Sequence, residues 1–274
     1  MLPPSNLPNG PHVMGILNVT PNSFSDGGQW SGEAATAHAR AMLNAGADII
    51  DVGGESTRPG AEPVEADEEV ARVAPVISAL RSITDAPISV DTMKPEVARA
   101  AMDAGATMWN DVLALRAPGA LEEAARLRRP VVLMHMQGEP RTMQNAPSYD
   151  DVVADVIAFL RERVAAAEAV GLTDVWVDPG IGFGKTLDQN LALLRNSARI
   201  REETGKPILI GVSRKRFIQA IDQSAVDAAS DRMGGSVAAA IWAARAGADI
   251  VRVHDVAETV QALKVWRALE DKLT

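Results

Sequence analysis

Eight short apolar runs of this chain each end in a polar side chain that could do chemistry. The eight ends carry Asn18, Asp51, Asp91, Asn110, His135, Asp178, Ser213 with Lys215, and Arg252 with His254. At any single position, a polar residue that caps a strand and begins a loop is the simpler interpretation. Because all eight ends share the property, and three of them carry carboxylates, we expect these side chains to gather in one polar site of mixed charge.

Two groups of these side chains suit two parts of one ligand. Asp91, Asn110 and Asp178 offer acceptors and an amide, which suits a flat heterocycle with an amino group and a ring N–H. A second group offers positive charge and donors, which suits a phosphate or diphosphate. Its members are Lys215, Arg252 and His254. Asn18 could complete an oxygen-rich Mg²⁺ position, because that ion takes few protein ligands when phosphates supply the rest. The sequence therefore indicates a base-like heterocycle that bears a phosphate ester.

A repeated pattern indicates which elements position these residues. Three segments share one plan: the end of a helix, then Ala-Gly-Ala, then a short β-type stretch and a polar residue. They are NAGADIID (44–51), DAGATMWN (103–110) and RAGADIVR (245–252). Glycine suits the left-handed conformation that commonly ends a helix. The same plan predicts eight strands separated by helix-periodic segments. They lie near 12–18, 48–52, 87–91, 107–110, 130–135, 174–178, 207–212 and 249–253.

Eight such units predict an α/β protein built as a single (β/α)8 TIM barrel. An open, doubly wound sheet has the same alternation of strands and helices. It is the second choice, because the chain shows eight repeats and no smaller domain. In a barrel the carboxyl ends of the strands meet at one mouth, where rigid strands hold the chemistry. Four prolines within residues 1–11 predict an irregular N-terminal arm, so we expect the barrel domain over 12–274.

Composition narrows the class of function. Lys and Arg total 27 against 36 Asp and Glu, a formal charge of −9, which argues against nucleic-acid partners because they need basic surface. The chain has no cysteine, which excludes disulfides, thiolate nucleophiles and Cys-ligated zinc. No apolar run approaches the ~20 residues that cross a bilayer. The first basic residue is Arg40, which disfavours a signal peptide. We expect a cytoplasmic protein with neither nucleic-acid nor membrane partners.

Familiar catalytic motifs do not fit the chain. The GFGKT stretch at 182–186 resembles the end of a phosphate-binding P-loop, but the first glycine of that motif would fall at Pro179. The four histidines show no metal-ligand spacing. No G-x-S-x-G elbow is present, and Ser213 has no evident base near it in the sequence. The sequence therefore predicts a site without a Ser–His pair.

Three long loops carry a resemblance to one known family. They are MGILNVTPNSFSDGG (14–28), IIDVGGESTRPGA (49–61) and LMHMQGEPRTMQ (133–144), and they occur in order with ISVDT, WND, VDPGIGFGKT, GVSRKRF and VRVHDV. With these motifs the chain resembles the dihydropteroate synthases over residues 12–270. That resemblance implies a TIM barrel that joins p-aminobenzoate to 7,8-dihydropterin-6-ylmethyl diphosphate, giving dihydropteroate and diphosphate in folate synthesis. One departure is Asn22, where the family pattern has Asp; we regard it as a tolerated variation.

The resemblance also implies roles for individual residues. Catalytic roles fall on Lys215, Arg252, His254 and Asp26. Substrate-binding roles fall on Thr57, Arg58, Asp91, Asn110, Asp178, Phe183, Gly211, Ser213, Lys215, Arg252 and His254. The implied cofactor is Mg²⁺, with Asn18 as its contact. A homodimer is also implied, with the apolar surface of 227–247 as the expected patch.

The expected chemistry is early loss of diphosphate, because the pterin ring delocalises the developing cation. Mg²⁺, Arg252 and His254 would stabilise the leaving anion. The arylamine is neutral at pH 7, so no strong general base is required, and Asp91 and Asp178 serve as ring anchors. The alternatives are a non-catalytic pterin-binding paralogue, a pterin-dependent methyltransferase barrel and, less favoured, a phosphosugar aldolase.

Overall fold

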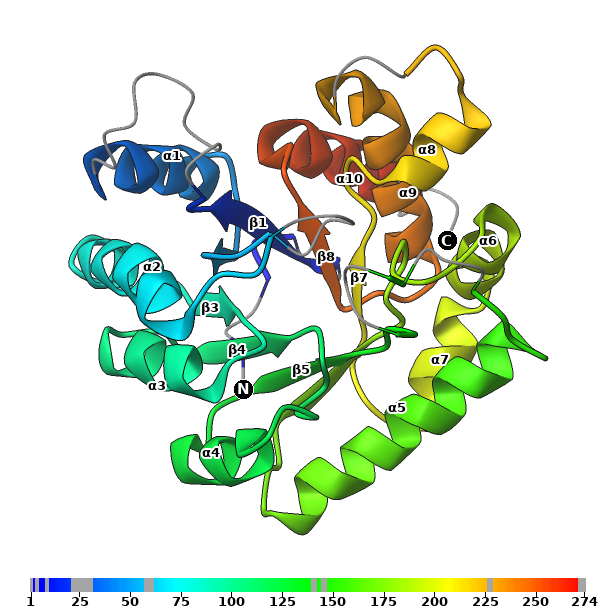
Figure 1. Cartoon of the computed structure of the whole chain (residues 1–274). Helices are drawn as coiled ribbons and strands as arrows, with labels where there is room; N and C mark the ends of the chain where they lie inside the picture. The colour runs from blue at the N-terminus through cyan, green and yellow to red at the C-terminus, as the bar shows by residue number, and fades with distance from the viewer. Residues whose placement is uncertain are drawn as a thin grey trace.

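Eight parallel strands form the centre of the molecule, and helices connect them (Figure 1). The computed structural model describes residues 2, 5–7, 10–20, 32–56, 62–138, 142–143, 147–225 and 229–270. The strands are β1 (His12–Asn18), β2 (Ile49–Gly53), β3 (Ile88–Asp91), β4 (Met108–Asp111), β5 (Val131–Met134), β6 (Val175–Asp178), β7 (Leu209–Gly211) and β8 (Ile250–Val253). The eight predicted strands are confirmed, with every end within two residues of its predicted position.

The helices follow the strands in the order that the repeat predicts. They are α1 (Gly32–Asn44), α2 (Ala66–Arg81), α3 (Pro95–Asp103), α4 (Ala120–Leu127), α5 (Val152–Ala169), α6 (Leu187–Arg195), α7 (Ser197–Thr204), α8 (Arg216–Ile221), α9 (Met233–Arg245) and α10 (Val256–Glu270), with a 3₁₀ turn at Ala229–Arg232. Gly46, Gly105 and Gly247 end three of them with φ of 106°, 113° and 88°. The predicted left-handed glycines are confirmed, and each turns the chain directly into the next strand.

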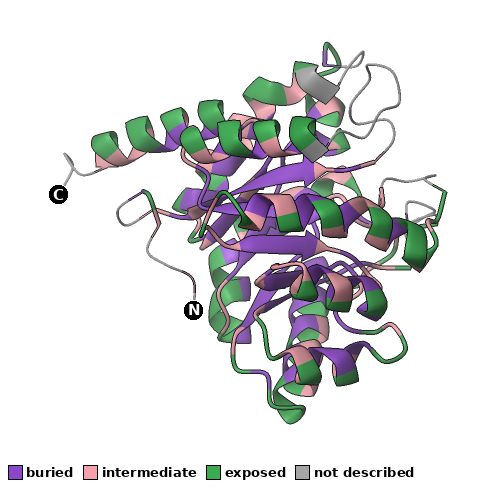
Figure 2. Ribbon diagram, turned by 90° about the vertical axis from the view of Figure 1, so that its left-hand side faces the viewer, coloured by how far each residue is buried: buried purple, intermediate pink, exposed green. Residues whose placement is uncertain are grey.

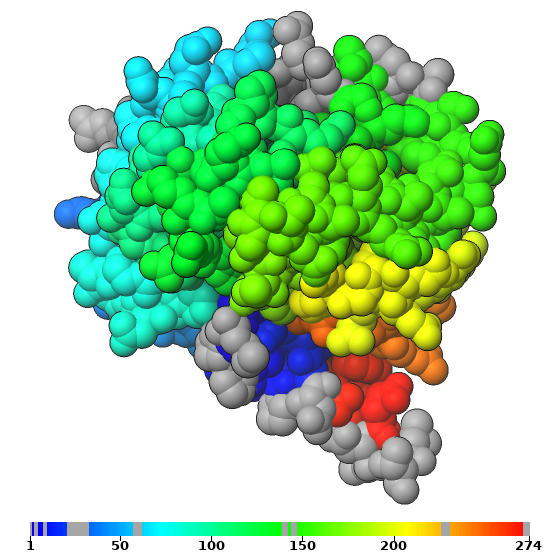
Figure 3. All heavy atoms as spheres, turned by 90° about the horizontal axis from the view of Figure 1, so that it is seen from below, coloured from blue at the N-terminus to red at the C-terminus, as the bar shows by residue number. Residues whose placement is uncertain are grey.

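The strands pair in cyclic order, which makes the sheet a barrel. Their order is β6-β5-β4-β3-β2-β1-β8-β7, and all the pairings are parallel. A parallel bridge between Val177 and Ile208 joins β6 to β7 and closes the ring. Because β1 pairs with β8, the first and last segments of the chain lie side by side (Figure 3). The predicted (β/α)8 barrel is confirmed, and the open-sheet alternative is wrong.

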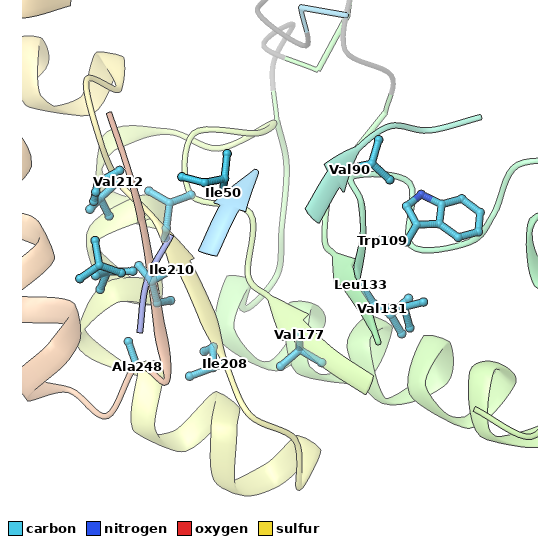
Figure 4. Packing of buried hydrophobic residues seen from close by; sticks show 14 of the residues in the cluster. Ile50, Val90, Trp109, Val131, Leu133, Val177, Ile208, Ile210, Val212 and Ala248 are labelled. Carbon is cyan, nitrogen blue, oxygen red and sulfur yellow. The ribbon is translucent and has the colours of Figure 1, made fainter. Parts of the chain in front are cut away.

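Side chains alternate across each strand, and this alternation builds two cores. One set faces the surrounding helices; Figure 4 shows part of it, with Ile50, Val90, Trp109, Val177 and Ile210 labelled. The other set forms the floor of the barrel interior. It consists of Met14, Ile49, Met108, Val132, Trp176, Leu209 and Ile250. The strands are thus buried on both faces, while the outer faces of the helices are exposed (Figure 2).

The described part of the N-terminal arm is held against the barrel. The carboxylate of Asp48 accepts the backbone N–H groups of Asn6 and Val13, each at 2.7 Å. Leu7 is buried, and Leu2 packs against the floor of the barrel. Among the helices in the described ranges, none has the length and apolar character that crossing a membrane requires.

Candidate active site

The mouth of the barrel is polar because of strand register. Two residues beyond the apolar floor, the inward-facing positions carry Asp51 on β2, Asn110 on β4, Asp178 on β6 and Arg252 on β8. Asp91 on β3 pairs with Asn110, so it stands at the same level. Residues i and i+2 of a strand face the same side, so these four inward-facing polar side chains lie directly above the apolar floor. The predicted gathering of strand-end side chains is therefore confirmed for these positions.

The guanidinium of Arg252 joins two carboxylates at the centre of this layer. Its Nε donates to Asp51 Oδ2 and its Nη2 donates to Asp91 Oδ2, both at 2.6 Å. Asn110 Nδ2 also donates to Asp51 Oδ2, at 3.3 Å. A guanidinium presents its donors in a rigid planar fork, so two carboxylates fix its orientation. Asp51 is thus part of the site; the sequence indicated a polar strand end there but no role.

Two carboxylate oxygens of the site accept no hydrogen bond from the described residues. Asp51 Oδ1 and Asp91 Oδ1 are buried, and within the described residues neither has a hydrogen-bond partner. A buried acceptor without a donor is costly, so donors from a ligand would be strongly favoured here. Ring N–H and amino groups are donors of that kind.

Burial and neighbouring charges shift the ionisation of the site residues. Burial raises the pKa of Asp91 to about 7, although Arg252 acts in the opposite direction. Burial also raises the pKa of Asp178, and the positive charge of Lys215 opposes it. The pKa of Lys215 falls to about 8 because of burial, opposed by Asp178. Burial disfavours the charged form of Arg252, but Asp51 and Asp91 outweigh it and raise its pKa. Clusters of perturbed groups in a cleft are typical of functional sites.

Lys215 reaches the loop between β6 and α6. Its Nζ donates to the carbonyl oxygen of Ile181 and lies 4.7 Å from the ring centroid of Phe183. A glycine makes room for it, since a Cβ on Gly182 would lie 3.1 Å from Lys215 Cδ; Gly211 is a neighbour, at which a Cβ would lie 3.7 Å from Lys215 Nζ. The structure therefore brings together the predicted residues Lys215, Phe183 and Gly211.

Ser213 and His254 form a contact that the sequence did not predict. Ser213 Oγ accepts the backbone N–H of His254 at 3.1 Å and lies 3.0 Å from its Nδ1. The loops that carry them are tied together, because Arg214 donates to both carboxylate oxygens of Asp255, at 2.5 and 3.1 Å. The prediction of a site without a Ser–His pair is wrong. Since β7 and β8 are neighbours only in the barrel, spacing along the chain cannot reveal the contact.

Asn18 ends β1 beside the polar layer. It pairs with Gly53, and a Cβ on Gly53 would lie 3.7 Å from Asn18 Oδ1. Three further predicted residues, Thr57, Arg58 and Asp26, lie outside the described residues, as does Asn22. Their implied roles stay predictions.

Comparison with known proteins identifies the family. Residues 14–254 match the model of the pterin binding enzyme family. The chain is 51% identical to the dihydropteroate synthase of Escherichia coli strain K12 in an alignment of 261 residues that covers 94% of this chain and 91% of that protein. The chain belongs to the dihydropteroate synthase family.

Solved structures of the dihydropteroate synthase family share the fold. The enzyme of Xanthomonas albilineans with 4-aminobenzoic acid superposes with a TM-score of 0.89 at 53% identity, covering 95% of this chain and 93% of that one. The same enzyme in complex with 7,8-dihydropteroate gives a TM-score of 0.86 at 51% identity, with 95% and 94% covered. The segment that matches the family model runs from β1 to the end of β8, so it contains the whole polar layer.

Proposed function

We propose that this chain condenses 7,8-dihydropterin-6-ylmethyl diphosphate with p-aminobenzoate, giving 7,8-dihydropteroate and diphosphate in folate biosynthesis. The observation that carries the proposal is the Arg252 guanidinium fixed between Asp51 and Asp91, whose other carboxylate oxygens are buried and meet no donor among the described residues. Family membership supports the proposal. So do the two solved structures of relatives, one with the substrate 4-aminobenzoic acid and the other with the product 7,8-dihydropteroate.

The pterin ring is held by its edge. Asp91 and Asp178 accept from its ring N–H and amino groups, and Asn110 offers both a donor and an acceptor. Lys215 donates to the ring close to the bond that is made. The planar guanidinium of Arg252 stacks on the ring face. These contacts orient the methylene carbon for attack, and orientation of this kind supplies a large part of an enzymatic rate.

The leaving diphosphate is held by positive charge and donors. His254 and Arg252 bind its oxygens, and Ser213 orients the imidazole, because its hydroxyl accepts from the His254 backbone and is left free to donate to Nδ1. A single well-placed donor to developing negative charge is typically worth ~3 kcal/mol of barrier. The C–O bond to the diphosphate therefore breaks early, and the pterin ring spreads the resulting positive charge.

The donor set at the mouth suits Mg²⁺. In the described part of the chain no three His, Cys, Asp or Glu side chains form a metal cluster. This donor set fits an ion that takes most of its oxygen ligands from the diphosphate, with Asn18 Oδ1 as the protein ligand. When bound, Mg²⁺ supplies positive charge to the diphosphate oxygens.

The arylamine of p-aminobenzoate attacks the methylene carbon without a strong base, because it is neutral at pH 7. Phe183 offers an aromatic face on that side of the site. The new C–N bond forms at the methylene carbon once the C–O bond has broken, and the amine proton leaves to solvent or to the departed diphosphate. Asp91 and Asp178 stay ring anchors throughout.

Diphosphate release tests the proposal directly. Purified chain with both substrates and Mg²⁺ is expected to release diphosphate, and Arg252→Ala should lower the rate about 100-fold or more. Arg199→Ala is a matched control, since Arg199 pairs with Glu203 on the exposed face of α7. A pterin-dependent methyltransferase, an aldolase or a non-catalytic paralogue would release no diphosphate.

We also propose that the chain forms a homodimer through α8 and α9 and works in the cytoplasm. Ile221, Met233 and Trp242 are large apolar side chains that are 59%, 41% and 50% exposed. An apolar groove beside them is lined by Leu194, Phe217 and Ile218. Contiguous exposed apolar surface favours an interface. Trp242→Arg should turn a dimer into a monomer in light scattering; a wild-type monomer would contradict the assembly.

A further inference from the structure

The GFGKT stretch contains a lysine that the motifs left unexplained. Lys185 lies in the loop between β6 and α6 and is only 4% exposed. Its Nζ donates to the carbonyl oxygens of Gly180 and Phe183, each at 2.9 Å, and lies 3.0 Å from His135 Nδ1. A lysine enclosed in this way has no access to a phosphate. Burying an ammonium is expensive: burial lowers the pKa of Lys185 to about 7, so its charged form depends on the acceptors around it.

The close partners of Lys185 match the donors of an ammonium in number. The ammonium has three N–H groups and meets three acceptors within 3.0 Å, while a fourth, the carbonyl oxygen of His135, lies farther away at 3.4 Å. The match requires His135 to be neutral, with its proton on Nε2 and a free lone pair on Nδ1. Burial, and next the charge of Lys185, lower the pKa of His135 to about 2, which keeps the ring neutral. Phe159 packs edge-on against this ring at 4.9 Å and holds its plane.

The same loop lies in direct contact with the end of β5. Gly180 has φ of +69°, and a Cβ on it would lie 1.8 Å from the carbonyl oxygen of His135. Only glycine allows both the conformation and the approach. A Cβ on Gly184 would lie 2.8 Å from the carbonyl oxygen of Gln137, so the contact continues along the loop. The loop therefore has one close-packed position against β5, and Lys185 links the two segments through His135.

The loop between β6 and α6 also supplies contacts to Lys215, the lysine assigned to the pterin. Lys185 donates to the carbonyl oxygens of Gly180 and Phe183, and Lys215 donates to that of Ile181, which lies between them in the chain. The ring of Phe183 packs against Lys215 Nζ. A shift of the loop would thus move both groups that hold the Lys215 ammonium.

We propose that Lys185 is a positioning residue for the pterin site, which fixes the loop of residues 180–184 so that Ile181 and Phe183 hold the Lys215 ammonium at the ring. This inference rests on the proposed function, because it assigns Lys215 to the pterin. Lys185 itself touches no substrate and acts through Lys215.

Lys185→Met tests the inference, since methionine fills similar space without donors. The KM for the pterin diphosphate should rise about 10-fold or more, with a smaller change in kcat. Loss of folded protein alone would lower the apparent kcat and leave the KM unchanged, and that result would overturn the inference. Lys206→Met is the control: its ion pair with Glu168 lies before β7, away from the mouth, so both constants should stay unchanged.

A double-mutant cycle tests the route through Lys215. In a Lys215→Met background, adding Lys185→Met should change the Kd for 6-hydroxymethyl-7,8-dihydropterin, measured by calorimetry, less than twofold. Additive losses would overturn the coupling. Because this assay needs no turnover, it stands even if the wild-type chain releases no diphosphate, which would defeat the proposed function instead.

A measurement on the wild-type chain covers the case in which the variants do not fold. With ¹⁵N-labelled histidine, and His135→Asn to assign the signal, Nδ1 of His135 should show the shift of an unprotonated ring nitrogen at pH 6. A proton on Nδ1 would remove the third acceptor and overturn the arrangement.

Discussion

Asp51 and Arg252 stand 201 residues apart in the chain, yet Nε of Arg252 lies 2.6 Å from Oδ2 of Asp51. Asp51 is fully buried, so little water reaches this ion pair. The contact joins β2 to β8 across the mouth of the barrel. It places a fixed positive charge at the centre of the proposed site.

Removing one charge of this pair should destabilise the fold. Asp51→Asn leaves Arg252 balanced by Asp91 alone, and breaking a buried pair from one side costs about 3 kcal/mol. Urea unfolding at pH 7 measures the loss. Glu203→Gln, which breaks an exposed pair with Arg199, should leave the midpoint unchanged. An Asp51→Asn protein as stable as the wild type would show that the pair contributes little.

Replacing the guanidinium by an ammonium should impair catalysis while keeping the charge. In Arg252→Lys a single point charge replaces a planar fork that donates to Asp51 and Asp91 together. The kcat/KM for diphosphate release should fall about 100-fold.

Arg201→Lys is a matched control for that change. Arg201 also donates through Nε and Nη2, to the two carboxylate oxygens of Asp249 at 2.8 and 3.0 Å, but at the other end of the barrel. It should keep wild-type kcat/KM. Near-normal activity of Arg252→Lys would mean that the charge alone suffices.

The affinity for the pterin ring should depend on pH in a bell-shaped manner. Below about pH 7 Asp91 gains a proton and loses an acceptor for the ring, because burial has raised its pKa. Above about pH 8 Lys215 loses a proton and a donor, because burial has lowered its pKa. Titration calorimetry from pH 5.5 to 9.5 measures both limbs. Asp91→Asn should remove the acid limb and Lys215→Met the alkaline one; limbs that persist in these variants would assign them to other groups.

Removing divalent cations should stop the reaction but leave product binding intact. Chelation with EDTA is expected to abolish diphosphate release, since the proposed Mg²⁺ supplies positive charge to the leaving group. Asn18→Ala should raise the Mg²⁺ concentration for half-maximal rate several-fold. Dihydropteroate, which carries no diphosphate, should bind equally well with and without EDTA. Full activity in EDTA would contradict a role for Mg²⁺.

Much of the architecture could be predicted from local patterns. The Ala-Gly-Ala helix ends, such as the one at Gly46, predict where strands begin, because glycine alone adopts the left-handed turn without strain. The two-residue alternation of buried strands then predicts that Asp51, Asn110 and Asp178 share the inner face above Ile49, Met108 and Trp176. Both signals come from neighbours along the chain.

The sequence by itself therefore determined the barrel, the polar strand ends and, through its motifs, the resemblance to a family. Only the tertiary structure decided which side chains contact each other at the mouth. These contacts are Asp51 with Arg252, Ser213 with His254, and Lys185 with His135, at separations of 201, 41 and 50 residues. Periodicity and turn chemistry are local properties of the backbone, so the sequence displays them. Ion pairs and hydrogen bonds at the mouth form between strands and loops that closure of the sheet brings together, and their geometry depends on register and burial that no local pattern encodes.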